Sequence, residues 1–521
     1  MKLENFKNYQ NIHIWAGIFS GLLLFICFAT SAFTIFKGPL NTWALHSENT
    51  MPAIAESQYD DLIQQVLIAH PEAGKEMTVY LPVAMTEHAP VQWVVRDEDT
   101  HDAVYWHASL DKNGQLISQQ AFLSDIGDFL DHLHRTAGIP GGDDHDAVGI
   151  WIMGIVCILY FVAIVSGLVI FLPTWAKDLF ALRKAKKAKR FWVDFHNILG
   201  ISALPFHIII AVTTVVFAYH DILYGSMQSL VYKDKPMFNR PAVIDVDRNN
   251  ENLLSIETLR QKITETEPDF NMAELRFSGL GTPRSRLIIG GELEGEIIRG
   301  PYYAFWVTDP YTASAGYTAM LPSVSGAAGK IVNGFFTLHF GGFGGSTIHW
   351  IYFALGLSGS LLFLTGNIIW IEGRRKRSTA NAPATQKRSV RILSRLTVGV
   401  CTGTFIGIGL SLLAAKFAAA TQSNIQFYQH LGYYGGFLAA IAYSFLVTPI
   451  KAAIHSLYAL TAIALSLIVA TCIYWNASVS STINIAFIGV AISLIALFIL
   501  IAKRLAAKAH ACAPRRCLAI T

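Results

Sequence analysis

Four histidines lie in stretches of the chain that are otherwise apolar enough to enter a lipid bilayer: His13, His196, His207 and His349. Imidazole is a common ligand of metals and of haem iron. An ionisable side chain in hydrocarbon is costly and usually has a function. The alternative is a polar residue that only lines a helix interface. These histidines are therefore the first candidates for chemistry.

Two of them, His196 and His207, share the apolar run 191–221 and are eleven residues apart. On a straight helix, at roughly 100° and 1.5 Å per residue, the second returns to within about 20° of the first and lies about 16 Å further along the axis. Two imidazoles on one stripe at two depths are what a single helix needs to ligate two stacked haems. We therefore favour a functional role over simple packing.

The composition indicates the environment of these histidines. The chain has 521 residues, of which 53% are hydrophobic and 15% charged. We predict a polytopic α-helical membrane protein with about eight spans, because eight apolar runs are long enough to cross a bilayer. The first run lacks a cleavage site typical of a signal peptide, so we expect it to remain as a helix. The runs lie near 12–36, 149–172, 193–218, 347–371, 395–416, 427–449, 455–475 and 482–502.

The basic residues predict the topology. Lysine and arginine crowd the connections 177–190 and 374–395 and the C-terminal tail. The positive-inside rule places all three in the cytoplasm, together with both termini. The polar segments 37–148 and 219–346 then lie outside, in what would be the periplasm if the protein is in the inner membrane of a bacterium. Beside membrane helices, these basic tracts do not indicate nucleic-acid binding.

Both external segments have the pattern of a small α+β domain. In the first, an amphipathic helix at 59–70 precedes four strand-like runs, and 111–114 is a strong hairpin turn. In the second, a helix at 256–267 again precedes four strand candidates. We therefore expect two separate external domains, each with one helix on a small antiparallel sheet.

The first half of the chain is an internal duplication of span, external domain and span. Aligning His13 with His196 also aligns Gly17 with Gly200, and the stretch Leu133–Arg135 corresponds loosely to Leu338–Phe340. The predicted boundaries are span 1 at 1–36, external domain 1 at 37–148, span 2 at 149–173, a basic loop at 174–191, span 3 at 192–218, external domain 2 at 219–346, span 4 at 347–372, a basic linker at 373–394, a four-helix membrane module at 395–503 and a tail at 504–521.

Helical rise from the nearest charged residue estimates the depth of each histidine. His13 and His196 each lie roughly 9 Å above a cytoplasmic basic residue, so we predict that they face each other as the two ligands of an inner haem. His207 and His349 lie roughly 25 Å and 34 Å deep and form the predicted pair for an outer haem. An alternative outer ligand, in place of His349, is either of two histidines before span 2: His134 and His145.

A haem with two histidine ligands transfers electrons and does not activate oxygen. Two such haems at different depths would conduct electrons across the bilayer. No CxxCH motif is present, so the haems would be bound non-covalently, as haem b. Four glycines near the histidines suit the close approach of a flat macrocycle, although close helix packing explains them equally well: Gly17, Gly167, Gly200 and Gly366.

A candidate substrate site lies just outside the membrane. His132, His339 and the glycine-rich 341–345 could receive a ferric complex near the outer haem, with Phe340 and Phe343 as part of an aromatic wall. The alternative is ordinary surface histidines beside a flexible turn.

These features together resemble the PepSY-associated transmembrane helix family, iron-regulated inner-membrane proteins that include ferric-siderophore reductases. The resemblance covers roughly residues 1–376 and implies haem b and outward electron transfer to chelated iron. It does not cover the last four spans. The matching motifs are His13–Gly17, Leu133–Arg135, Asp194–Gly200, Leu204–His207, Leu338–Gly341, Thr365–Gly366 and Trp370.

The resulting hypothesis is a di-haem b reductase that passes electrons from a cytoplasmic or quinol donor to a periplasmic ferric siderophore. Two alternatives remain open at this point. The protein could be a PepSY-type regulatory or binding protein whose histidines only pack, or a siderophore permease without redox activity.

Overall fold

The structure is a computed structural model of the chain. Two predicted features lie outside its described residues: His145, and most of the basic loop and linker. The described residues are 3–45, 51–84, 89–96, 103–141, 147–175, 183, 188–234, 246–293, 295–317, 321–375, 385–421, 424–475 and 481–511.

Within the described ranges, six helices are long and apolar enough to cross a membrane. The shortest has 24 residues, and at about 1.5 Å per residue it exceeds the roughly 30 Å of a hydrocarbon core. The six are α1 (Leu3–Thr34), α5 (Val148–Phe171), α12 (Gly345–Arg374), α13 (Arg388–Thr421), α15 (Pro449–Ile473) and α16 (Ser481–Ala511).

A seventh span is broken into α7 (Ala188–Ser202) and α8 (Leu204–Ala218), which meet at 69°. Pro205 lies in the first turn of α8. Proline removes a backbone donor and its ring clashes with the preceding turn, so a helix bends or breaks at this point. The prediction of one straight helix is wrong here, and His196 and His207 do not share a stripe.

The remaining helix of the C-terminal module is α14 (Ile425–Leu446). By composition, α14 is not apolar enough to count as a membrane span. The described residues therefore contain six spans, or seven if the bent pair is counted as one, whereas the sequence predicts about eight. α14 nevertheless packs closely on α13. A Cβ on Gly432 would lie 2.9 Å from the carbonyl oxygen of Leu410, and one on Gly407 would lie 2.8 Å from that of Tyr433. Small residues therefore bring these two backbones together.

The external strands form one eight-stranded antiparallel sheet in the order β4-β3-β2-β1-β5-β6-β7-β8. The sequence predicts two separate sheets. In the structure β1 and β5 pair directly, with Met77 opposite Phe277 and Val79 opposite Leu275. The strands are β1 (Glu76–Tyr80), β2 (Val91–Arg96), β3 (Ala103–Leu110), β4 (Leu116–Ala121), β5 (Asn271–Ser278), β6 (Arg286–Glu292), β7 (Ala304–Thr308) and β8 (Ala315–Tyr317).

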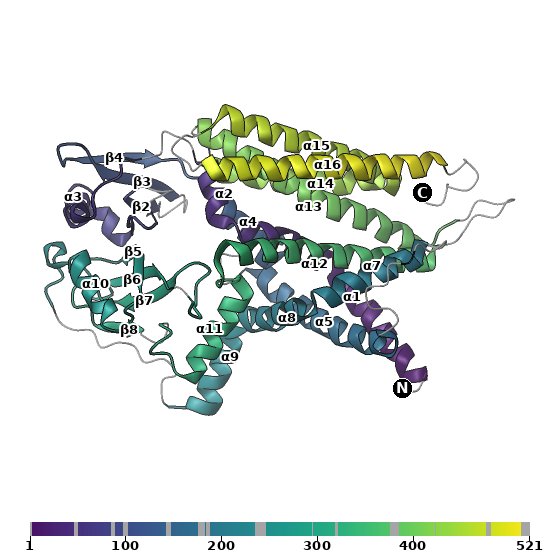
Figure 1. The fold of residues 1–521 in the computed structure, drawn as a ribbon, viewed down its shortest axis with the longest axis horizontal. Coiled ribbons are helices and arrows are strands. Elements are labelled where there is room, and N and C mark those ends of the chain that lie inside the picture. The colour runs from purple at the N-terminus through teal and green to yellow at the C-terminus, as the bar shows by residue number, and fades with distance from the viewer. Residues whose placement is uncertain are drawn as a thin grey trace.

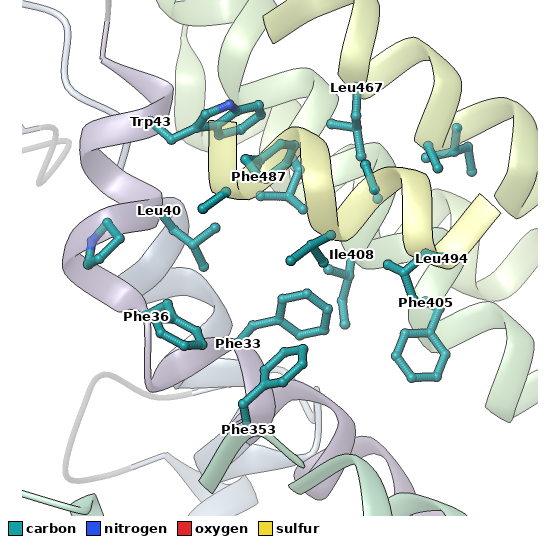
Figure 2. A pocket seen from close by; sticks show the side chains of 18 of the residues that line it. Phe33, Phe36, Leu40, Trp43, Phe353, Phe405, Ile408, Leu467, Phe487 and Leu494 are labelled. Carbon is teal, nitrogen blue, oxygen red and sulfur yellow. The ribbon is translucent and has the colours of Figure 1, made fainter. Parts of the chain in front are cut away.

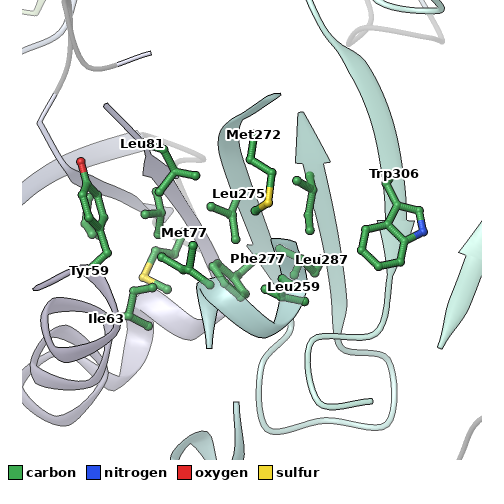
Figure 3. Close-up of a cluster of buried hydrophobic side chains, with 14 of the residues drawn as sticks. Tyr59, Ile63, Met77, Leu81, Leu259, Met272, Leu275, Phe277, Leu287 and Trp306 are labelled. Atoms are coloured by element: carbon green, nitrogen blue, oxygen red, sulfur yellow. The ribbon is translucent and has the colours of Figure 1, made fainter. Parts of the chain in front are cut away.

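Two helices, α3 (Tyr59–Ala69) and α10 (Ile256–Thr264), share one core with this sheet. Figure 3 shows the cluster, in which side chains from both halves interleave. The halves are also joined by a hydrogen bond, since the amide of Ile256 donates to Asp60 Oδ1 at 3.0 Å. The two copies therefore fold into one external domain.

Four shorter helices connect the sheet to the spans: α2 (Lys37–Ala44), α4 (Ile126–Thr136), α9 (His220–Met227) and α11 (Ala327–Phe340). The sheet lies at one end of the helices, while α1 begins and α16 ends at the opposite end (Figure 1). We call these ends the sheet side and the terminal side. The external segments thus lie together, away from both ends of the chain.

Candidate functional site

His13 of α1 and His196 of α7 lie next to each other near the terminal side, and we call them the inner pair. Their ring centres are 6.2 Å apart and their planes make an angle of 77°. His13 Nδ1 donates to the carbonyl oxygen of Ala163 at 2.8 Å. His196 Nδ1 lies 3.1 Å from the carbonyl of Leu362 and 2.9 Å from Thr365 Oγ1. Because carbonyls only accept, the proton is on Nδ1 of each ring and the Nε2 lone pair is left for a ligand.

His134 of α4 and His339 of α11 form a second pair, the outer pair. Their ring centres are 6.4 Å apart with an interplanar angle of 43°. His134 Nδ1 donates to the carbonyl of Cys27 at 3.0 Å. His339 Nδ1 lies 2.8 Å from Thr213 Oγ1, whose own proton goes to the carbonyl of Ile209 at 2.7 Å. Here too Nε2 is available.

Burial keeps the outer imidazoles neutral. It lowers the pKa of His134, and it lowers the pKa of His339 to about 3, with a further contribution from the neighbouring His134. Neutral imidazole is the form that ligates a metal. Within the described part of the chain, no hydrogen bond is made by Nε2 of any of the four paired histidines, which are His13, His134, His196 and His339.

The hydrogen-bond partners repeat with the duplication. Ala163 and Leu362 occupy equivalent positions on α5 and α12, and each carbonyl receives one histidine of the inner pair. A hydroxyl three residues later also donates to each carbonyl: Ser166 at 3.2 Å and Thr365 at 2.8 Å. Such partners orient a ligating imidazole and fix its tautomer.

Glycine is required where α5 passes the inner pair. A Cβ on Gly167 would lie 2.8 Å from His13 Cε1, which is too close without displacing the ring. The equivalent Gly366 is less crowded, at 3.6 Å from His196 Cε1. A Cβ on Gly17, one turn after His13, would meet no atom within 4 Å. The space beside the inner pair is thus open along α1.

The ring separations fit two imidazoles on opposite sides of one metal ion. With a metal–nitrogen bond of about 2.0–2.1 Å, as at zinc, and the nitrogen about 1.2 Å from its ring centre, the centres should be about 6.4 Å apart. The observed values are 6.2 and 6.4 Å. His13 and Cys27, which mark the two levels on α1, are fourteen residues or about 21 Å apart along the helix. The arrangement would suit two separate metal centres, each held by two histidines.

The predicted outer pair of His207 and His349 is not brought together. His207 Nδ1 is 2.6 Å from Tyr160 Oη, and its Nε2 is buried without a partner among the described residues. The ring of His349 instead contacts that of Tyr302, with centres 5.5 Å apart. The bend before Leu204 accounts for this, because it changes the direction of α8 relative to α7. His134, the alternative ligand, does lie in a facing pair.

Of the predicted substrate residues, the structure brings the rings of His339 and Phe340 together, with centres 5.3 Å apart. His339 faces His134, Phe340 stacks on Phe217 with ring centres 6.1 Å apart, and Phe343 is exposed. His132 lies on α4, two residues before His134. The sequence did contain a signal for the pairing of His134 with His339, since the duplication aligns the two stretches that contain them.

An aromatic cluster includes the sequence neighbours of residues that contact the two pairs. Phe28 follows Cys27, which contacts the outer pair, and Phe363 follows Leu362, which contacts the inner pair. The rings of Phe28 and Phe363 are 5.2 Å apart. Tyr160 contacts both, at 5.8 and 5.4 Å. The three rings thus contact one another, and two of them are adjacent in sequence to residues that bind the paired histidines.

Residues 10–373 match a family model described as the PepSY-associated TM region. A search of the curated proteins found no match. The matched range contains both histidine pairs and the whole external sheet, and it ends before α13.

Proposed function

The chain belongs to the PepSY-associated TM region family, and on that premise we propose that it is a membrane reductase that holds two b-type haems and delivers electrons to a ferric chelate on the sheet side. The observation that carries the proposal is the presence of two facing histidine pairs at two levels of one helix bundle. A porphyrin supplies four equatorial nitrogens, so two imidazoles complete the coordination of its iron.

A haem with two histidine ligands would supply one-electron transfer at each level. The protein's own residues would set its position. Ala163, Leu362, Cys27 and Thr213 accept the Nδ1 protons and hold the imidazole planes, and the glycine at 167 lets the His13 ring lie against α5. The contacting rings of Phe28, Tyr160 and Phe363 favour passage of an electron from one level to the other.

The proposed acceptor is iron in a siderophore, as the family resemblance implies. Reduction to ferrous iron weakens a chelate built from hard oxygen donors and frees the metal. The electrons would enter from a cytoplasmic or quinol donor at the inner pair. Basic residues at the terminal ends of the spans support a cytoplasmic terminal side and a periplasmic sheet in a bacterial inner membrane: Lys189, Arg190, Arg374, Arg375, Lys387 and Arg388.

The test is the haem content of the purified full-length protein. We expect b-type bands after dithionite reduction and two haems per chain. His196→Ala and His339→Ala should each retain one haem, whereas His349→Ala should retain both. A folded, colourless protein would overturn the proposal. Loss of a haem in His349→Ala with retention of both in His339→Ala would overturn the assignment of the outer pair.

A further inference from the structure

A cavity of about 280 Å³ lies at the seam between the family-matched core and the C-terminal module of α13 to α16. Figure 2 shows side chains from both parts pointing into it. Core residues that line it include Phe33, Leu40 and Phe353, and the module contributes Ile408 and Phe487 among others.

The lining is chemically uniform, since it consists almost entirely of carbon. The polar groups of Trp43, which lines the cavity, are already engaged. Its indole N–H donates to Thr471 Oγ1 at 3.1 Å, and its carbonyl accepts from Lys416 Nζ at 2.5 Å. Among the described lining residues, other polar side-chain groups are few, the Thr482 hydroxyl at the start of α16 being one, so the lining suits a hydrocarbon chain.

The position of the cavity limits what can enter. Most of its walls come from membrane-spanning helices, and Pro39, Leu40 and Trp43 come from α2. On α16 the lining runs from Thr482, at the sheet-side end, to Phe498 near the middle of the helix. On α1 the lining begins at Phe33, in the last turn. Only molecules in the sheet-side leaflet of the bilayer have direct access. A volume of this size is too large to leave empty without destabilising the seam.

We propose that one acyl chain of a phospholipid from the sheet-side leaflet occupies this cavity and seals the module against the core. An isoprenoid quinone is a poorer fit, because its two ring carbonyls would find few hydrogen-bond donors, such as the Thr482 hydroxyl, among the described lining residues. The inference is independent of haem binding, since none of the four paired histidines lines the cavity.

The experiment uses full-length protein in nanodiscs of phosphatidylethanolamine that contain a phospholipid with a photoreactive diazirine on one acyl chain. Ala486→Phe combined with Val490→Phe fills the cavity from α16. The matched control, Ala496→Phe with Leu500→Phe, has the same spacing on the same helix but lies outside the lining. Phe487→Ala enlarges the cavity and serves as a third variant.

After irradiation, we expect labelled peptides from the cavity walls in the wild type. The filled variant should show at least a fivefold loss of this labelling, the control no change, and Phe487→Ala an increase. Unchanged labelling in the filled variant would overturn the proposal, as would co-purification of one quinone per chain that the filled variant loses. If the filled variant does not fold, absence of extra labelling in Phe487→Ala would overturn it.

Discussion

At the scale of single residues, the tautomer of each paired histidine follows from its surroundings. A backbone carbonyl or a hydroxyl that already donates elsewhere accepts from Nδ1, which leaves the Nε2 lone pair available for a ligand. Such partners are typical of ligating histidines and are usually worth about tenfold to a hundredfold in affinity for the metal. Because the partners differ between the inner and the outer pair, substitutions of the partners test the two pairs separately.

Gly167→Ala should disturb the inner pair because its Cβ would lie 2.8 Å from His13 Cε1. We expect severalfold lower occupancy of the inner haem and a changed low-spin signal in electron paramagnetic resonance spectra. The equivalent Gly366→Ala, with 3.6 Å to His196 Cε1, is the control and should remain near wild type. Equal behaviour of the two variants would mean that the crowding at 167 does not matter.

Thr213→Val should weaken the outer pair because His339 Nδ1 loses its acceptor. We expect the outer haem to transfer to apomyoglobin about tenfold more readily than in the wild type. Thr30→Val is the matched control, since the hydroxyl of Thr30 bonds only to main-chain carbonyls on its own helix. If both variants release haem alike, the hydrogen bond from His339 has no specific role.

At the scale of secondary-structure elements, the bend between α7 and α8 and the pairing of β1 with β5 set the architecture. The bend sends His196 toward α1 and α12, and His207 toward Tyr160 of α5. The pairing of β1 with β5 satisfies two strand edges that two separate sheets would leave exposed to other chains. The bend and the strand pairing each bring together residues from the two copies of the duplication.

The register of β1 against β5 predicts a specific cross-link. Thr78 and Arg276 are directly opposite, so Thr78→Cys with Arg276→Cys should form a disulfide under mild oxidation. Peptide mass spectrometry would detect it in the full-length protein. Thr78→Cys with Leu275→Cys is the control, because successive residues in a strand point to opposite faces and the thiols cannot meet. A disulfide in the control alone would show a different register.

At the scale of the whole molecule, the C-terminal module supports the helix that carries His134. Gln429 Nε2 donates to Ser124 Oγ at 2.8 Å, and Gln426 Nε2 donates to Asp125 Oδ2 at 3.1 Å, both just before α4. The buried side chains of α4 also pack in one cluster with residues of α13 to α15. Among the described residues, the inner pair makes its hydrogen bonds to α5 and α12 and none to the module.

Removing residues 376–521 should therefore affect the two levels unequally. We expect the truncated protein to keep its inner haem and to lose at least half of the outer one, as measured by haem per chain in the purified protein. Adding His196→Ala to the truncation would identify which haem remains. Removal of 512–521 alone is the control and should leave the haem content unchanged. Equal retention at both levels would show that the module does not support α4.

The sequence by itself determined the membrane class, the duplication, the α+β pattern of the external segments and the family, which the family match confirms. These depend on composition, periodicity and order along the chain. It also predicted that His13 and His196 face each other, and the structure places them so. Haem itself stays a prediction.

Only the tertiary structure decided the outer pair and the single sheet. His134 reaches Cys27 across 107 residues, His339 reaches Thr213 across 126, and β1 joins β5 across the whole of spans 2 and 3. Local patterns do not report such contacts, since they depend on where a helix bends and on which strand edges meet. Counting residues along an ideal straight helix therefore placed His207 at the outer level, where the folded chain instead places His134 and His339.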